Sequence, residues 1–103
     1  MIIISACIDT QPGTVEAMTD AITTMMEASE AEDGCHSYVF SAEIGKPTNI
    51  RIFELWEDEA ALKAHFQTTH MAEFQAAMAA NPPKGTDLKA FDVNGEIPFP
   101  DVR

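Results

Sequence analysis

Residues 49–70 read NIRIFELWEDEAALKAHFQTTH and contain a change of hydrophobic period that decides the fold. Residues 49–57 are rich in β-branched and aromatic side chains, which predicts a strand. Asp58 is a favourable N-cap residue, so a helix should start directly after the strand. The inward face of that helix is predicted to carry Ala61, Leu62, His65 and Phe66.

Strands and helices alternate on both sides of this segment. Thr68-Thr69 should interrupt the helix and cap a second helical piece, which Asn81-Pro82-Pro83 ends because proline cannot continue a helix. Glu43 to Thr48 reads as a hairpin loop. The remaining predicted elements are a strand at 2–9, a helix at 14–30 that stops near Gly34, a strand at 35–42 and a last strand at 85–94.

The resulting order, β-α-β-β-α-β, is that of an α+β ferredoxin-like sandwich with an antiparallel sheet. Its helices cover one sheet face and leave the other bare. The first and third strands carry apolar residues on both faces, and such a bare patch is larger than monomers usually expose. We therefore expect a homodimer packed through the sheet face. The domain should span residues 1–95, followed by an extended tail at 96–103.

The charge balance limits the classes of partner. Seventeen acidic residues and six basic ones give a formal net charge of −11. This field repels nucleic acids and anionic membrane surfaces, so a small-molecule substrate is the expected partner. No apolar run approaches the roughly 20 residues of a membrane span. The N-terminus lacks the basic start of a signal peptide, and a cytoplasmic location is expected.

The two cysteines and an acidic run have plain structural interpretations. Cys7 and Cys35 lie in strands separated by a third strand, roughly 9–10 Å apart, which is too far for a disulfide. Glu30-Ala31-Glu32-Asp33-Gly34 follows the first predicted helix. We expect a solvated, mobile turn there rather than a metal site.

Residues 53–74 resemble the signature of the antibiotic biosynthesis monooxygenase superfamily. The resemblance consists of a strand ending in Glu54-x-Trp56, an acidic cap, Ala-Leu, His65, a second histidine at His70 and an aromatic at Phe74. It implies a dimeric ferredoxin-like fold of the α/β-barrel type. Family members include cofactor-free oxygenases of quinols and polyphenols, heme-degrading enzymes and some isomerases.

The resemblance implies roles for three residues. Trp56 would line a pocket and donate its indole N–H to a substrate oxygen, and His70 would line the mouth. His65, on the inward helix face, would accept a phenolic proton. The ionised quinol could then pass an electron to dioxygen in a dry pocket. The structural alternatives are a core tryptophan, a buried neutral histidine and a capping histidine.

Substrate-binding candidates lie on neighbouring elements. Glu54 shares the strand face of Trp56 and could orient a histidine or pair with Arg51 or Lys89. Phe74 follows His70 by one helical turn. The second strand places Tyr38 and Phe40, together with the weaker candidate His36, on one face.

Neither a metal nor another cofactor is expected. Two histidines five residues apart diverge by roughly 140° on a continuous helix, so His65 and His70 could converge only if Thr68-Thr69 bends the path. Their spacing differs from that of a two-histidine zinc helix, and no cysteine or third histidine is placed to help. In heme-degrading relatives a tryptophan stands at the position of His65 and the axial histidine at that of Gln75, so heme degradation is not expected.

The first hypothesis is therefore a cofactor-independent monooxygenase of a small aromatic, quinol-like substrate. One alternative is an isomerase of a small dicarbonyl compound, with or without a phosphate group, which basic residues at the pocket mouth would favour. The other is a non-catalytic ligand-binding or structural dimer. A pocket filled by Trp56, Phe40 and Phe74 would favour it.

Overall fold

The computed structural model describes residues 1–101 and contains four strands and three helices. Their order is β-α-β-β-α-α-β, in which the second crossover consists of two helices. The elements are β1 (Ile2–Asp9), α1 (Thr14–Glu30), β2 (Cys35–Glu43), β3 (Lys46–Trp56), α2 (Glu59–His65), α3 (Thr69–Ala80) and β4 (Gly85–Asp92).

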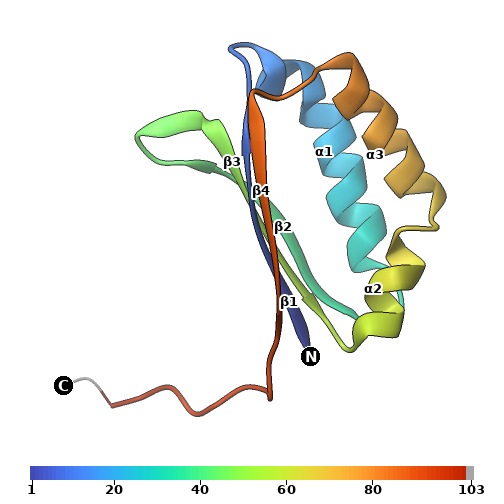
Figure 1. Ribbon diagram of the computed structural model, residues 1–103, viewed down its shortest axis with the longest axis vertical. Helices are drawn as coiled ribbons and strands as arrows, with labels where there is room; N and C mark the ends of the chain where they lie inside the picture. Colours follow the sequence, from blue (N-terminus) through green and yellow to red (C-terminus); the bar gives the residue numbers. More distant parts are fainter. Residues whose placement is uncertain (102–103) are drawn as a thin grey trace.

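The strands form one antiparallel sheet in the order β2-β3-β1-β4. All three helices lie on one side of it, and the opposite face is uncovered (Figure 1). This arrangement confirms the predicted ferredoxin-like sandwich. As predicted, β3 lies between β1 and β2, and both cysteines are free.

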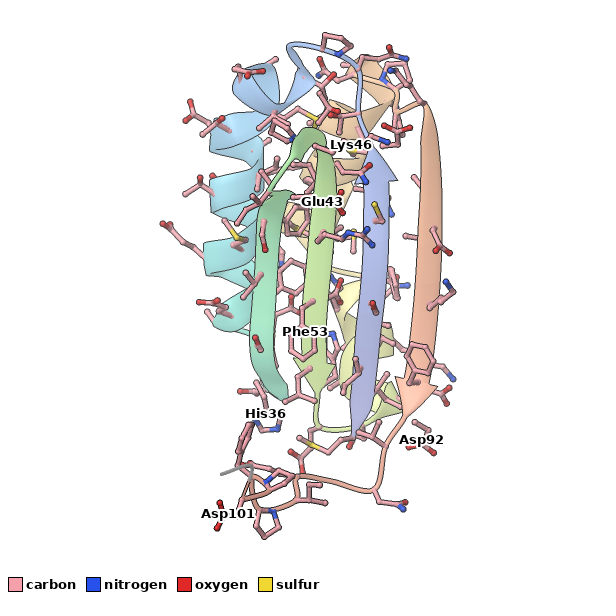
Figure 2. The ribbon with its side chains drawn as sticks, turned by 90° about the vertical axis from the view of Figure 1, so that its left-hand side faces the viewer. His36, Glu43, Lys46, Phe53, Asp92 and Asp101 are labelled. Atoms are coloured by element: carbon pink, nitrogen blue, oxygen red, sulfur yellow. The ribbon has the colours of Figure 1, made fainter. Side chains whose placement is uncertain are left out.

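The core lies between the sheet and the helices in two clusters. In the first, Ala6 faces Ile52 across the β1–β3 ladder and Ile8 faces Ile50. Alternation then sends Phe53 to the uncovered face, where it is 45% exposed (Figure 2). The second cluster lies nearer to α2 and contains Met25, Tyr38, Trp56 and Met71.

Both predicted caps are present. The Asp58 carboxylate accepts a hydrogen bond from the Ala61 amide at 2.8 Å, and the Thr68 hydroxyl accepts one from the Met71 amide at 3.2 Å. The inward position predicted for Phe66 is wrong. α2 ends at His65, and Phe66, its C-cap, is 53% exposed.

Two details of the β2–β3 hairpin also differ from the predictions. The predicted loop at residues 43–48 is a two-residue turn of Ile44 and Gly45, so β3 begins at Lys46. Gly45 has a φ of +89° at the second central position of the turn, the position at which a type II turn requires a positive φ and favours glycine. A register shift between Cys35 and Ser37 turns His36 away from the sheet face that carries Tyr38. His36 instead pairs with the exposed Glu57.

The ends of the chain add little to the core. β4 is exposed along its whole length, and the chain from residue 96 to 101 is exposed and has no regular secondary structure. Residues 102–103 of the predicted tail lie outside the described residues. Within residues 1–101, none of the helices combines the length and apolarity needed to cross a membrane.

Candidate functional site

Two histidines and one glutamate from three separate elements meet at a single oxygen atom. His65 Nδ1 and His70 Nε2 both donate to Glu32 Oε2, at 2.6 and 2.7 Å. The side chain of His65 is 1% exposed, that of Glu32 13% and that of His70 18%. The expectation of a solvated turn is therefore wrong for Glu32, which is a site residue that the sequence interpretation missed.

A bend between α2 and α3 makes the two histidines converge. The Thr68 hydroxyl donates to the backbone oxygen of His65 at 2.7 Å while it caps α3. Thr68 thus contacts the last residue of α2 and caps α3, which begins at Thr69, one residue before His70. The two imidazole centroids lie 5.9 Å apart, instead of on diverging sides of one helix.

Gly34 brings Glu32 to the histidines. Its φ of +81° is left-handed, and a Cβ built there would lie 2.7 Å from the Cβ of Ala61 in α2. The Glu57 amide also donates to the Gly34 oxygen at 2.8 Å. The missing side chain thus allows the turn after α1 to lie directly against α2, and so places Glu32 beside His65.

We predict that Gly34→Ala lowers the free energy of unfolding by about 2–4 kcal/mol. Left-handed backbone costs an alanine about 1–2 kcal/mol, and the clash with Ala61 adds a further overpacking cost. Urea denaturation measures the effect. Gly45→Ala is the matched control, because Gly45 has a φ of +89° with nothing within 4 Å. Equal losses in the two variants would show that the close approach is unimportant.

Trp56 and Glu54 form a buried pair. The indole Nε1 donates to Glu54 Oε1 at 2.9 Å, and the two residues are 0% and 8% exposed. Burial raises the pKa of Glu54, the hydrogen bond from Trp56 opposes this rise, and the charge of Glu32 adds to it. Glu54 thus holds the indole rather than a histidine. Arg51 pairs with Glu43 and Lys89 with Asp87.

The raised pKa of Glu54 predicts a pH-dependent stability difference. A carboxyl group with a raised folded-state pKa binds its proton more tightly when folded, so stability falls as pH rises from 4.5 through that pKa. Glu54→Gln keeps an acceptor for Trp56 and removes the buried charge. It should match the wild type in thermal denaturation at pH 4 and become more stable than it towards pH 7.

Glu43→Gln is the control of opposite sign. The hydrogen bond from Arg51 lowers the pKa of Glu43, so its contribution is present at neutral pH and is lost as pH falls. Its replacement should reduce stability at pH 7 and not at low pH. The same trend in both variants would contradict the assignment of a raised pKa to Glu54.

The aromatic candidates pack around His65. The ring centroid of Tyr38 lies 5.2 Å from that of His65, and the ring centroid of Trp56 lies 4.8 Å from it. Burial strongly raises the pKa of Tyr38, so its phenol stays protonated at neutral pH. Phe40 contacts Phe74 edge to face at 5.5 Å. The structure therefore brings the predicted residues together, with His36 on the other face.

An open cavity of about 200 Å³ lies between α1 and α3, next to the histidine cluster. His70 and Phe74 line it, whereas Trp56 and His65 are buried and are not among its lining residues. Among residues 1–101, no lysine or arginine is in its wall, and Asp20 and Glu73 make it acidic. The described residues of the wall are Asp20, Ala21, Thr24, Met25, His70, Glu73 and Phe74.

Residues 1–77 match the sequence model of a protein family described as antibiotic biosynthesis monooxygenase. The chain is 34% identical over 73 residues to the uncharacterized protein sll1783 of Synechocystis, covering 71% of this chain and half of that protein's length. It is 32% identical over 88 residues to the probable quinol monooxygenase YgiN of Escherichia coli, covering 76% of this chain and 85% of YgiN.

The fold is shared with solved structures at lower sequence identity. PA3566 from Pseudomonas aeruginosa superposes with a TM-score of 0.81 at 24% identity. The match covers 91% of this chain and 94% of PA3566. Helices, sheet and crossovers are therefore arranged alike in the two proteins.

Proposed function

The chain belongs to the antibiotic biosynthesis monooxygenase family, and we propose that it is a cofactor-independent monooxygenase of a small, uncharged hydroquinone. The observation that carries the proposal is the convergence of His70 and His65 on Glu32 beside an open cavity. The relationship to a probable quinol monooxygenase supports the substrate class.

The size and charge of the cavity favour a single neutral ring. A cavity of roughly 150 Å³ accommodates benzene, so about 200 Å³ suits one six-membered ring with small substituents. Met25 and Phe74 supply apolar contacts. Asp20 and Glu73 repel anions, and this argues against the phosphorylated substrate of the isomerase alternative.

His70 is the proposed catalytic base. Because its Nε2 donates to Glu32, its Nδ1 keeps the lone pair and can accept a phenolic proton. The electron-rich quinolate then reduces dioxygen, a carbon–oxygen bond forms, and His70 returns the proton to give a hydroperoxide. The O–O bond breaks and water leaves with the ring C–H proton. The ring gains one oxygen atom and loses two hydrogens, which balances hydroquinone and O₂ against hydroxyquinone and water.

The same proposal gives Trp56 and His65 positioning roles in place of the substrate contacts predicted from the sequence. His65 fixes the Glu32 carboxylate from the buried side. Trp56 packs on the His65 ring and is itself held by Glu54. Neither side chain lines the cavity, so a substrate bound there contacts His70 first.

An oxygen electrode with a panel of mono- and disubstituted hydroquinones tests the proposal. We expect stoichiometric O₂ consumption and a hydroxyquinone product that carries one ¹⁸O atom from ¹⁸O₂. Saturable binding of the panel without oxygen uptake would instead favour the non-catalytic ligand-binding alternative, which the buried positions of Trp56 and His65 also suit.

We further propose that the protein is a homodimer through the uncovered sheet face. Large apolar side chains remain exposed there, with Val39 at 41%, Phe53 at 45% and Phe91 at 50%. Phe53 points away from the helices (Figure 2), and the ladder pairs it with Val39. A second copy would cover this patch.

The dimer predicts a shift in mass when the patch is charged. Phe53→Glu should convert the protein to a monomer in size-exclusion chromatography with light scattering. Phe66→Glu is the matched control, because Phe66 is 53% exposed in the helical layer on the other side. A monomeric wild-type protein at micromolar concentration would contradict the proposal.

A further inference from the structure

We propose that Glu32, His65 and His70 bind one divalent transition-metal ion, with Zn²⁺ as the reference ion. This site is independent of whether the oxygenase proposal holds. Among the described residues 1–101, these three form a group whose potential ligand atoms all lie within 4.8 Å of one another. Two imidazoles and one carboxylate are a donor set that Zn²⁺ and related ions prefer.

The three potential ligand atoms, which lie within 4.8 Å of one another, must rearrange to accept an ion. Bonds of about 2.0–2.1 Å in a tetrahedral site place neighbouring ligand atoms about 3.3 Å apart. The two nitrogens now lie 2.6 and 2.7 Å from Glu32 Oε2, so this oxygen must recede by about 0.7 Å from each. Glu32 lies in a turn rather than in a helix or strand, and its side chain has three torsions for this movement.

His65 carries an unsatisfied polar atom in the metal-free arrangement. While Nδ1 donates to Glu32, Nε2 is buried and has no hydrogen-bond partner among residues 1–101. Ligation through Nδ1 transfers the ring proton to Nε2. The ring centroids of Trp56 and Tyr38 lie 4.8 and 5.2 Å from that of His65, and aromatic π faces are weak hydrogen-bond acceptors.

The electrostatic surroundings favour a cation. In the described part of the chain, the ion-pair partners of Glu32 are the two histidines, and Lys63 pairs with Glu59 instead. The charge of Glu32 also contributes to the raised pKa of Glu54. The ion can enter through the acidic cavity that His70 lines, and a water from this cavity can complete four-coordination.

Isothermal titration calorimetry with ZnCl₂, and visible absorption with CoCl₂, test the site. We expect one ion per chain and a tetrahedral Co²⁺ spectrum. His70→Ala and Glu32→Gln should each weaken binding by more than about 100-fold, because even loss of residues that only support metal ligands costs 10–100-fold. Both side chains are partly exposed, and the isosteric Glu32→Gln keeps the test decisive if His70→Ala fails to fold.

Two controls exclude other binding sites. His36 pairs with Glu57 on the surface, so His36→Ala should leave the Zn²⁺ affinity unchanged. Burial, followed by the charges of Glu32 and Glu54, raises the pKa of the Cys35 thiol to about 11, which disfavours thiolate ligation. The double variant Cys7→Ser, Cys35→Ser should therefore still bind.

Absence of stoichiometric binding would overturn the inference. So would binding that survives in both His70→Ala and Glu32→Gln, or that disappears with the cysteines. In a protein that consumes oxygen, stoichiometric Zn²⁺ should also abolish uptake, because it occupies the nitrogen atoms that hold Glu32 in place. Calorimetry and the Co²⁺ spectrum report on the ion even if no hydroquinone is ever oxidised.

Discussion

Oxygen uptake by the His70→Ala protein should fall by about 10²–10⁴-fold at saturating hydroquinone, the range that a positioned general base contributes. His70 is the member of the cluster that lines the cavity, and Glu32 fixes its Nε2 at 2.7 Å. Without the imidazole the quinol must lose its proton to water, so the electron-rich quinolate forms less often. The loss should diminish as pH rises and the substrate ionises unaided.

Glu32→Gln and His36→Ala accompany this measurement, all in the presence of a chelator so that metal binding does not interfere. The amide still contacts His70 but carries no charge, so Glu32→Gln should show an intermediate loss of rate with little change in KM. His36→Ala removes an exposed histidine–glutamate pair and should retain full activity. Undiminished uptake in His70→Ala at neutral pH would rule out its role as the base.

Trp56→Ala should lower the free energy of unfolding by about 3–5 kcal/mol, the range for removing a large aromatic from a core. Trp56 is 0% exposed and packs with Met25, Tyr38 and Met71. Its loss also leaves the Glu54 carboxyl buried without the indole donor. Guanidinium unfolding monitored by circular dichroism measures the change, since the single tryptophan is gone.

A double-mutant cycle separates the hydrogen bond from the packing. Trp56→Phe keeps most of the aromatic volume but removes the donor, and an unsatisfied buried acceptor costs about 1–3 kcal/mol. Adding Glu54→Leu to Trp56→Phe should recover much of that loss, because both polar partners are then apolar. Strictly additive effects would show that the 2.9 Å contact between Trp56 and Glu54 is not coupled.

Local chemistry made much of the fold predictable. Asp58 and Thr68 are residues whose side chains cap helices within three positions of themselves, and both caps occur as predicted. The alternation of Ile50 and Ile52 places them together on the core face. The family-like segment likewise brought Glu54, Trp56 and His65 into one region, because a strand that runs directly into a helix leaves little freedom for their relative placement.

The errors concern features that depend on distant contacts or on a single extra residue. Glu32 lies 33 positions before His65, and the close approach of the Gly34 backbone to α2, together with the hydrogen bond from the Glu57 amide, brings it there. In the sequence it is one acidic residue in an acidic run. Similarly, one register shift reverses the side on which His36 lies, and no local composition distinguishes a regular strand from a bulged one.

The strand order has a consequence for the order in which the protein can fold during synthesis. β1 occupies the interior of the sheet, yet it is made before both of its neighbours, and its pairing with β4 joins Ile2 to Asp92. The edge of β1 that pairs with β4 therefore lacks its hydrogen-bond partner strand until the ribosome has released β4. Contacts so distant along the chain slow folding, and an unpaired apolar edge can associate with other chains in the meantime. A nascent chain that ends before Gly85 is thus the form of this protein most in need of a chaperone.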